Sequence, residues 1–516
     1  MDTVALGSRA GKWIMVSSIL ASSMAFIDGT ALNVVLPSLQ KSLNATGTDI
    51  FWILNAYLLM LAALILIGGS LGDQLGRKKI FMTGISIFIC GSAACGFAPG
   101  VTALVAFRMI QGVGGALMIP GSLSLISSAI RPQERGKAIG TWSAFTTIVT
   151  MGGPALGGAF ADAGLWRYIF FINIPLGLAA LLILGFEVKE SRDEDSDHKL
   201  DYLGAISIAL GLGLVTFGFL RIPALGLYQP QVITSLGGGV VMLVTFIIIE
   251  YKSPHPMMPL KLFANATFSG ANLLTFFLYA GLGAGMLFMS LNMVQVQGYS
   301  QLQSGLTFLP FTLLMIVIAR RAGSLADKHG PRVLLITGPT ITGAGLLMLS
   351  FIKQTDGAAD YWTSFFPGIL VFGFGMSLTV APLTAAVMGS VSDHYSGTAS
   401  GVNNAVSRIA GVFTNAIFCT LAVLFFTTAL QHRVGSLALS GVQKHAVMAQ
   451  AADLGNAHVP AIIVASGKAV IQKDFHESFI AMYSLIMKIA AGLGFAGALM
   501  AFIFIRDGAH SKTQPD

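Results

Sequence analysis

Long apolar stretches, separated by short polar or charged segments, dominate the 516 residues of this chain. A helix rises about 1.5 Å per residue, so about 20 apolar residues cross the ~30 Å hydrocarbon core of a bilayer. Fourteen stretches have the length of such a helix. They lie at roughly 13–36, 50–70, 80–98, 102–127, 137–160, 168–186, 202–220, 232–250, 268–291, 304–319, 333–352, 363–388, 400–430 and 477–505. The pattern predicts an all-α integral membrane protein with 14 transmembrane helices.

A charged, glycine-rich turn occurs twice along the chain. The copies at Gly69–Lys79 and Gly323–Pro331 share Gly, Ser, Leu, Asp and Gly at 5 of 9 aligned positions, 254 residues apart. Glycines let the backbone turn and the helices approach closely. Because each copy follows the second helix of a set of six, the repeat predicts two six-helix bundles with two extra helices inserted between them.

The repeat divides the chain into three parts. We predict an N-terminal bundle over residues 1–190, a linker with the two inserted helices over 191–265, and a C-terminal bundle over 266–516. A long loop at about 431–476 interrupts the last bundle, and we expect it to be extracytoplasmic and to contain some helix.

Composition and charge agree with this class. Hydrophobic residues make up 54% of the chain and charged residues only 10%, against roughly 25% in soluble domains. With the N-terminus inside, inner segments hold 19 of the 30 Lys and Arg residues and outer loops hold 8. The net charge of +7 therefore reflects membrane topology and not nucleic-acid binding, and both termini and both turns are expected in the cytoplasm. The three cysteines lie in apolar stretches and the nine histidines lie outside them, so we expect no disulfide framework, metal site or zinc enzyme.

Asp28 lies inside the first apolar stretch. A carboxylate at mid-membrane costs about 2.5–3.5 kcal/mol on insertion scales, so it must face a partner or a water-filled cavity. One interpretation is that Asp28 takes and releases a proton or binds a cation. The other is that it only caps or packs near the outer mouth.

Three basic residues also lie inside apolar stretches. Arg108 in the fourth either bonds carbonyl groups of a neighbouring helix or carries a permanent charge that tunes a carboxylate or contacts substrate. For Arg408 and Lys488 we expect structural roles near a membrane interface.

The fifth stretch contains a run of small residues around one proline, with Gly153, Pro154, Gly157 and Gly158. Proline removes a helix hydrogen bond and kinks a span, and small residues permit close helix contact. The alternative is ordinary glycine packing.

Together these motifs resemble the Major Facilitator Superfamily. Gly69–Lys79 resembles its motif A, Leu104–Gly112 its motif B, and Gly153–Gly158 the motif C of antiporters, although Val149 replaces an expected glycine. The segments Ile27–Pro37 and Trp166–Gly177 are similar to segments of the 14-span drug:proton antiporter family.

The resemblance implies a function and roles for individual residues. Two bundles would rock about a central cavity, and inward proton movement would drive the export of a hydrophobic, often cationic compound. Asp28 would be the coupling acid and Arg108 would assist its protonation. The cytoplasmic gate would comprise Gly69, Asp73, Gly76, Arg77 and Lys78. No cofactor beyond the coupling proton is implied, and the expected partners are a small-molecule substrate and the lipid bilayer, with the chain a monomer.

One departure bears on the substrate. Helices 9, 10, 12 and 13 contain no acidic residue, whereas some relatives carry acids in that half. A neutral or anionic substrate, or reliance on Asp28 alone, is then an alternative. A carrier for a dedicated metabolite competes with the drug exporter. A membrane-embedded enzyme is less favoured, because no cluster of His, Asp, Cys or Glu lies at one membrane depth, and a channel is less favoured, because it would not need the repeated turns.

Overall fold

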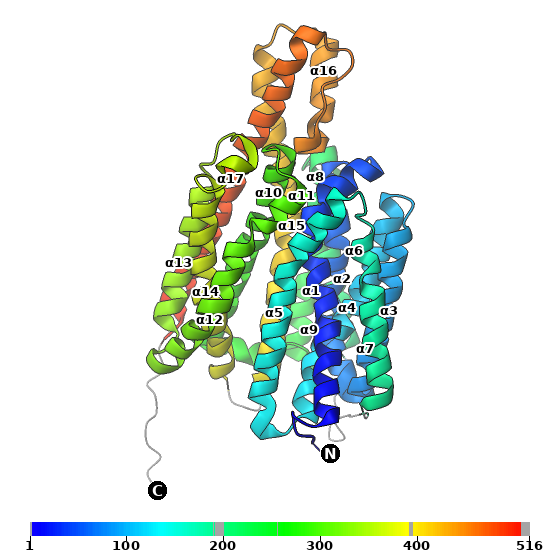
Figure 1. Ribbon diagram of the computed structural model, residues 1–516, viewed down its shortest axis with the longest axis vertical. Helices are drawn as coiled ribbons and strands as arrows, with labels where there is room; N and C mark the ends of the chain where they lie inside the picture. Colours follow the sequence, from blue (N-terminus) through cyan, green and yellow to red (C-terminus); the bar gives the residue numbers. More distant parts are fainter. Residues whose placement is uncertain (1–2, 189, 191–200, 255, 392–395, 507–516) are drawn as a thin grey trace.

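The computed structural model describes residues 3–188, 190, 201–254, 256–391 and 396–506 (Figure 1). These residues form α-helices and short 3-10 helices, with no β-strand among them. Thirteen helices are long and apolar enough to cross a membrane. The prediction of an all-α membrane protein is therefore confirmed.

The first part of the chain forms helices in nearly the order that the apolar stretches predict. They are α1 (Arg9–Leu43), α2 (Gly47–Leu75), α3 (Arg77–Phe97), α4 (Val101–Ala129), α5 (Pro132–Asp162), α6 (Tyr168–Phe171), α7 (Asn173–Glu187), α8 (Tyr202–Leu225) and α9 (Pro230–Lys252). Helix α5 is absent from the thirteen, but its 31 residues span about 46 Å at 1.5 Å per residue, enough to cross the bilayer.

The second part begins with η1 (Leu260–Ala264). It continues with α10 (Ala266–Gln295), α11 (Gln301–Leu306), α12 (Leu309–His329), α13 (Arg332–Leu349), η2 (Gly357–Asp360), α14 (Phe365–Gly389), α15 (Ser396–Ser436), α16 (Gly441–Ala449), η4 (Gln450–Asn456) and α17 (Ala465–Phe504). Two predicted helices are interrupted, because the chain bends between α6 and α7 and between α11 and α12.

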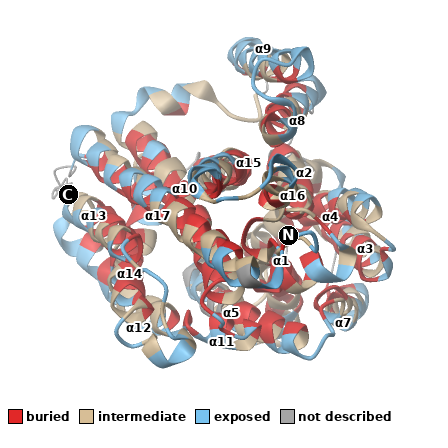
Figure 2. Ribbon diagram, turned by 90° about the horizontal axis from the view of Figure 1, so that it is seen from above, coloured by how far each residue is buried: buried red, intermediate tan, exposed pale blue. Residues whose placement is uncertain are grey.

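The helices pack as two groups with a pair at the side. In the first group α4 packs against α2 and α3, and α1 packs against α5 and α7. In the second, α14 packs against α12 and α13, while α17 packs against α10 and α13. Helices α8 and α9 pack on each other at the edge of the molecule, where α8 contacts α2 and α15 (Figure 2).

The two ends of the bundle differ. Helix α1 begins and α17 ends at one end, here called the terminal end, and α16 lies at the opposite end, called the loop end (Figure 1). The loop predicted at 431–476 is shorter than expected, because α15 and α17 continue past the other helices as a hairpin. Arg433 on α15 pairs with Asp474 and Glu477 on α17, which stabilises the polar extensions of both helices.

Candidate functional site

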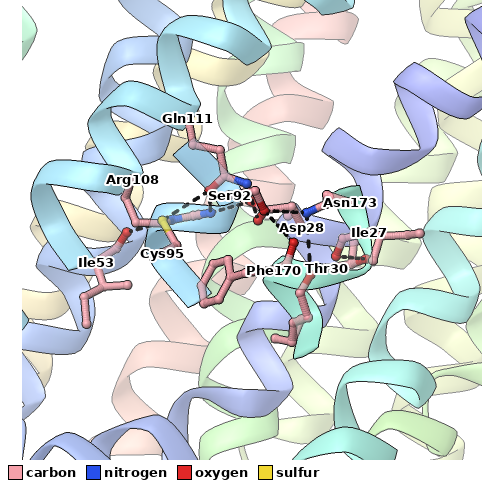
Figure 3. Close-up of polar contacts among 12 residues, drawn as sticks. Ile27, Asp28, Thr30, Ile53, Ser92, Cys95, Arg108, Gln111, Phe170 and Asn173 are labelled. Atoms are coloured by element: carbon pink, nitrogen blue, oxygen red, sulfur yellow. Dashed lines mark hydrogen bonds and ion pairs between the residues drawn. The ribbon is translucent and has the colours of Figure 1, made fainter. Parts of the chain in front are cut away.

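Asp28 is 2% exposed, and two side chains of α4 bind its carboxylate (Figure 3). Its Oδ2 accepts a hydrogen bond from Arg108 Nη1 at 2.6 Å, and its Oδ1 accepts one from Gln111 Nε2 at 3.0 Å. Arg108 Nη1 also donates to Gln111 Oε1 at 2.8 Å, so the three side chains form a closed ring of hydrogen bonds. The carboxylate that the sequence singled out therefore has a fully buried cationic partner.

Arg108 is held in place by the helix next to its own. Its Nε donates to the Ile53 carbonyl oxygen of α2 at 3.4 Å, and its guanidinium carbon lies 4.5 Å from the centre of the Tyr57 ring. Helix α2 comes this close because α4 carries Gly112, where a Cβ would lie 2.5 Å from the Tyr57 carbonyl oxygen. Arg108 thus bonds a neighbouring carbonyl and also neutralises a carboxylate, which unites both predicted roles.

A second set of polar contacts lies beside this pair. Asn173 Nδ2 of α7 donates to Ser92 Oγ of α3 at 3.0 Å, and Ser92 Oγ donates to the Phe170 carbonyl oxygen at 2.8 Å (Figure 3). Cys95 Sγ of α3, three residues beyond Ser92, lies 3.8 Å from Gln111 Oε1 of the ring around Asp28. Helices α1, α3, α4 and α7 therefore meet at one buried polar layer.

Sequence reasoning did not assign Gln111 or Tyr57 to the site. Gln111 follows Arg108 by three residues, a spacing that puts both side chains on one helix face, and this signal was present in the sequence. For Tyr57 there was no such signal, because its contact with Arg108 depends on how α2 packs against α4.

The glycines of α5 lie where three helices meet. A Cβ on Gly157 would lie 2.6 Å from the Ala31 carbonyl oxygen of α1, and one on Gly153 would overlap Thr30 Oγ1. A Cβ on Gly158 would overlap the Gln301 carbonyl oxygen of α11, and Gly305 of α11 packs equally closely on the Pro154 carbonyl group. The motif therefore brings α5 against α1, two to three residues beyond Asp28, and against the second group of helices.

Asp162, the last residue of α5, fixes this junction. Its two carboxylate oxygens accept hydrogen bonds at 2.9 Å from the backbone N–H groups of Gln301 and Leu302. These N–H groups begin α11, where helix geometry leaves donors without internal partners and favours a negative charge. Ser290 Oγ, which donates to the Asn33 carbonyl oxygen at 3.5 Å, is a further link between the groups toward the loop end.

The glycine turn lies at the terminal end, apart from Asp28. Gly76 has φ +110° and Gly330 has φ +86°, a conformation that favours glycine, and each N–H donates to the carbonyl oxygen four residues earlier. The repeat in the sequence is thus a repeat of one backbone turn. Gly69 faces Pro120 of α4. The side chain of Asp73 lies outside the described residues.

A linker residue caps the helix that follows this turn. Glu190 accepts hydrogen bonds from the backbone N–H groups of Lys78 and Lys79 at 2.9 and 3.0 Å. Lys78 Nζ in turn donates to the Val188 carbonyl oxygen at 2.7 Å. Arg77 is the first residue of α3. The predicted gate residues Arg77 and Lys78 therefore lie against the start of the linker.

Comparison with known proteins places this arrangement in a family. The model of the Major Facilitator Superfamily matches residues 18–415, which include Asp28, Arg108 and the first copy of the turn. The chain belongs to the Major Facilitator Superfamily. It is thus a multi-pass membrane transporter of small molecules, and the predicted resemblance is confirmed.

Relatives and solved structures of this transporter agree. It is 28% identical to the tetracenomycin C resistance and export protein of Streptomyces glaucescens, over 100% of this chain and 94% of that protein. It is 29% identical to the multidrug resistance protein Stp of Mycobacterium tuberculosis (strain CDC 1551 / Oshkosh), over 96% of this chain and 91% of that protein. A bacterial homologue of the human lysosomal transporter Spinster, inward-facing and unoccupied, shares the fold with a TM-score of 0.66, at 17% identity over 98% of this chain and 100% of that one.

Proposed function

We propose that this transporter exports drugs or other hydrophobic small molecules from the cell, driven by protons that enter through Asp28. The ion pair between Asp28 and Arg108 carries the proposal, because it is the kind of group that can exchange a proton inside a membrane. The names of two relatives, which describe multidrug resistance and the resistance to and export of one compound, support a role in export.

The buried ring provides a proton step. When Asp28 takes a proton, its ion pair with Arg108 is lost, and the remaining hydrogen bond joins the guanidinium to a neutral carboxyl group. Arg108 then keeps Gln111, the Ile53 carbonyl group and the Tyr57 ring as partners, so its charge stays solvated by protein groups. We infer that loss and gain of this proton changes how tightly α1 is bound to α4.

Alternating access follows from the junctions at the two ends. The contacts of Asp162 and Gly158 with α11 close the loop end, and we assign them to an inward-facing state. The uneven distribution of Lys and Arg makes the terminal end cytoplasmic, so the turn Gly69–Lys78 forms the cytoplasmic gate. In the domain division that we propose, residues 1–190 and 266–516 are the rocking bundles, and 191–265 is the linker with the inserted pair.

Drug susceptibility tests this function. Cells that express the chain should survive higher concentrations of several chemically diverse toxins than cells that lack it, and Asp28→Asn should abolish the difference. Protection against one compound alone would favour a dedicated exporter instead. Counterflow of labelled substrate in proteoliposomes separates a carrier from a channel, and its absence would contradict the proposal.

A further inference from the structure

Arg408 lies well inside the apolar part of α15. Twelve residues separate it from the first residue of this helix, about 18 Å at 1.5 Å per residue, so it is far from the membrane surface at the terminal end. Around it, α15 packs on the other helix group: Ala405 lies in one apolar cluster with Tyr57 and Leu61 of α2, and Gly411 faces Leu58. This part of α15 therefore lies between the two halves.

The Arg408 guanidinium faces inward from this position. The helix that carries it, α15, packs against α2, which carries Tyr57, and against α10, which carries Tyr279. The side chain is half-buried, and its Nε is buried. Arg408 thus keeps part of its guanidinium buried, whereas the sequence led us to expect a structural role near a membrane interface.

Arg408 has no hydrogen-bond or ion-pair partner among the described residues. Its buried Nε has no acceptor among them. Arg108 by contrast binds Asp28, Gln111 and the Ile53 carbonyl group, and Lys488 lies 5.6 Å from the centre of the Phe351 ring. Since Arg stays protonated in proteins and an unpaired charge inside a membrane is costly, a free guanidinium here indicates a site for a ligand.

The charge balance of the interior defines that ligand. Asp28 is already neutralised by Arg108, and the sequences of α10, α13, α14 and α15 contain no acidic residue. Among the described residues of these helices, Arg408 is therefore a positive charge without a compensating acid. Beside Tyr279 on the same helix, the Phe276 ring lies 6.4 Å from the Phe413 ring of α15, which offers an apolar surface.

We propose that Arg408 binds the anionic oxygen of the substrate, and that the transporter accepts organic anions with an aromatic body. This inference rests on the proposed function and specifies its substrate class. A guanidinium presents a planar fork of donors that matches a carboxylate, which a lysine ammonium group does not. Exchange of an outward-moving anion for an inward-moving proton is also favoured twice by an inside-negative membrane potential.

Three probes of one shape test the proposal: naphthoate, naphthamide and naphthylmethylammonium. Their binding to the full chain in nanodiscs is measured by calorimetry against empty nanodiscs. We expect naphthoate to bind about tenfold or more tightly than naphthamide, the effect of a hydrogen bond to a charged group, and the ammonium to bind most weakly. Three results with the wild-type chain would each overturn the inference: equal affinities, a preference for the ammonium, or undetectable binding of naphthoate.

Variants then locate the effect. Arg408→Gln should remove the preference for naphthoate, and Arg408→Lys should keep part of it, because the charge remains while the fork is lost. Lys488→Gln, which removes a positive charge elsewhere in a span, should leave the preference unchanged. Persistence of the preference in Arg408→Gln overturns the proposed site. If the preference for naphthoate persists in Arg408→Gln while Asp28→Asn loses proton coupling, only this inference fails. If Asp28→Asn retains proton coupling, the proposed function fails instead.

Discussion

Replacing Asp28 by asparagine keeps the shape of the side chain and removes its charge. In the native site, one carboxylate oxygen accepts from Arg108 and the other from Gln111. Asparagine offers a single acceptor oxygen, so one of these donors faces an amide group that also donates. Arg108, which is 1% exposed, then keeps a charge with no counter-ion. We expect Asp28→Asn to abolish proton-driven accumulation of substrate against a gradient.

The structure also predicts what this substitution does to stability. Removing one partner of a buried ion pair costs about 3–5 kcal/mol, because the other charge stays buried and uncompensated. The double variant Asp28→Asn/Arg108→Gln removes both charges and should therefore be more stable than the single variant Asp28→Asn. Thermal unfolding of the three proteins in detergent measures this difference. A double variant that is less stable than Asp28→Asn would show that the interaction between the two charges contributes little to stability.

Transport assays separate the coupling role of Asp28 from its role in stability. Proteoliposomes with an imposed pH gradient report substrate uptake, and the enclosed dye pyranine reports proton movement. In Asp28→Asn we expect substrate-dependent proton flux to be lost, while downhill exchange of a substrate persists if the protein is folded. Undiminished substrate-dependent proton flux in this variant would refute the assignment and place the coupling site elsewhere.

Four further predictions follow from the geometry. A cysteine at Lys79 should react with an impermeant reagent only from the cytoplasm, and one at Lys444 only from outside; the reverse pattern would contradict the topology. Gly76→Val should slow transport in a protein that still reaches the membrane, because valine at φ +110° costs about 1–3 kcal/mol; wild-type transport rates would contradict this. Asp162→Ala should remove the cap of α11, at about 0.5–2 kcal/mol, and widen the distance between spin labels on α5 and α11, whereas an unchanged distance would refute the closing role. Burial raises the pKa of the Asp453 carboxyl, so docking of η4 should weaken as pH rises from the ordinary carboxyl range through that raised pKa. Hydrogen exchange of η4 should report this pH dependence, and Asp453→Asn should remove it. An unchanged pH profile in the variant would count against this role of Asp453.

The sequence predicted the helices and the buried acid because both follow from the cost of polar groups in lipid. Backbone groups must be satisfied within a span, so apolar length alone identifies a helix. For the same reason a carboxylate such as Asp28 must have a partner, and Arg108 was the nearest candidate in the first half. Gln111 was within reach of the same reasoning, since it lies one turn from Arg108.

Other features depend on contacts between distant parts of the chain. The cap that Asp162 provides joins residues 139 positions apart, and the cap that Glu190 provides joins residues 112 apart. The end of α11 at Leu306 is different, because the sequence contains its signal: Pro310, four residues later, lacks the N–H that would bond the Leu306 carbonyl group. The role of Arg408 depended on whether an acceptor lies beside it, which only the packing of α15 determines.

The two halves repeat a backbone turn but not the chemistry of their interiors. Gly76 and Gly330 both have a positive φ, and each lies in one copy of the turn. The proposed proton exchange requires only one carboxylate, and Asp28 lies in the first half, whereas Arg408, which has no partner among the described residues, belongs to the second. Tyr57 connects the two halves: its ring packs on Arg108, its hydroxyl has no partner in the described structure, and it shares an apolar cluster with Ala405 of α15. Because Tyr57 is on α2, which packs directly on α15, any movement of α15 against α2 changes the surroundings of both charges, and this contact is a route by which the proposed substrate binding and the proposed proton exchange can affect each other.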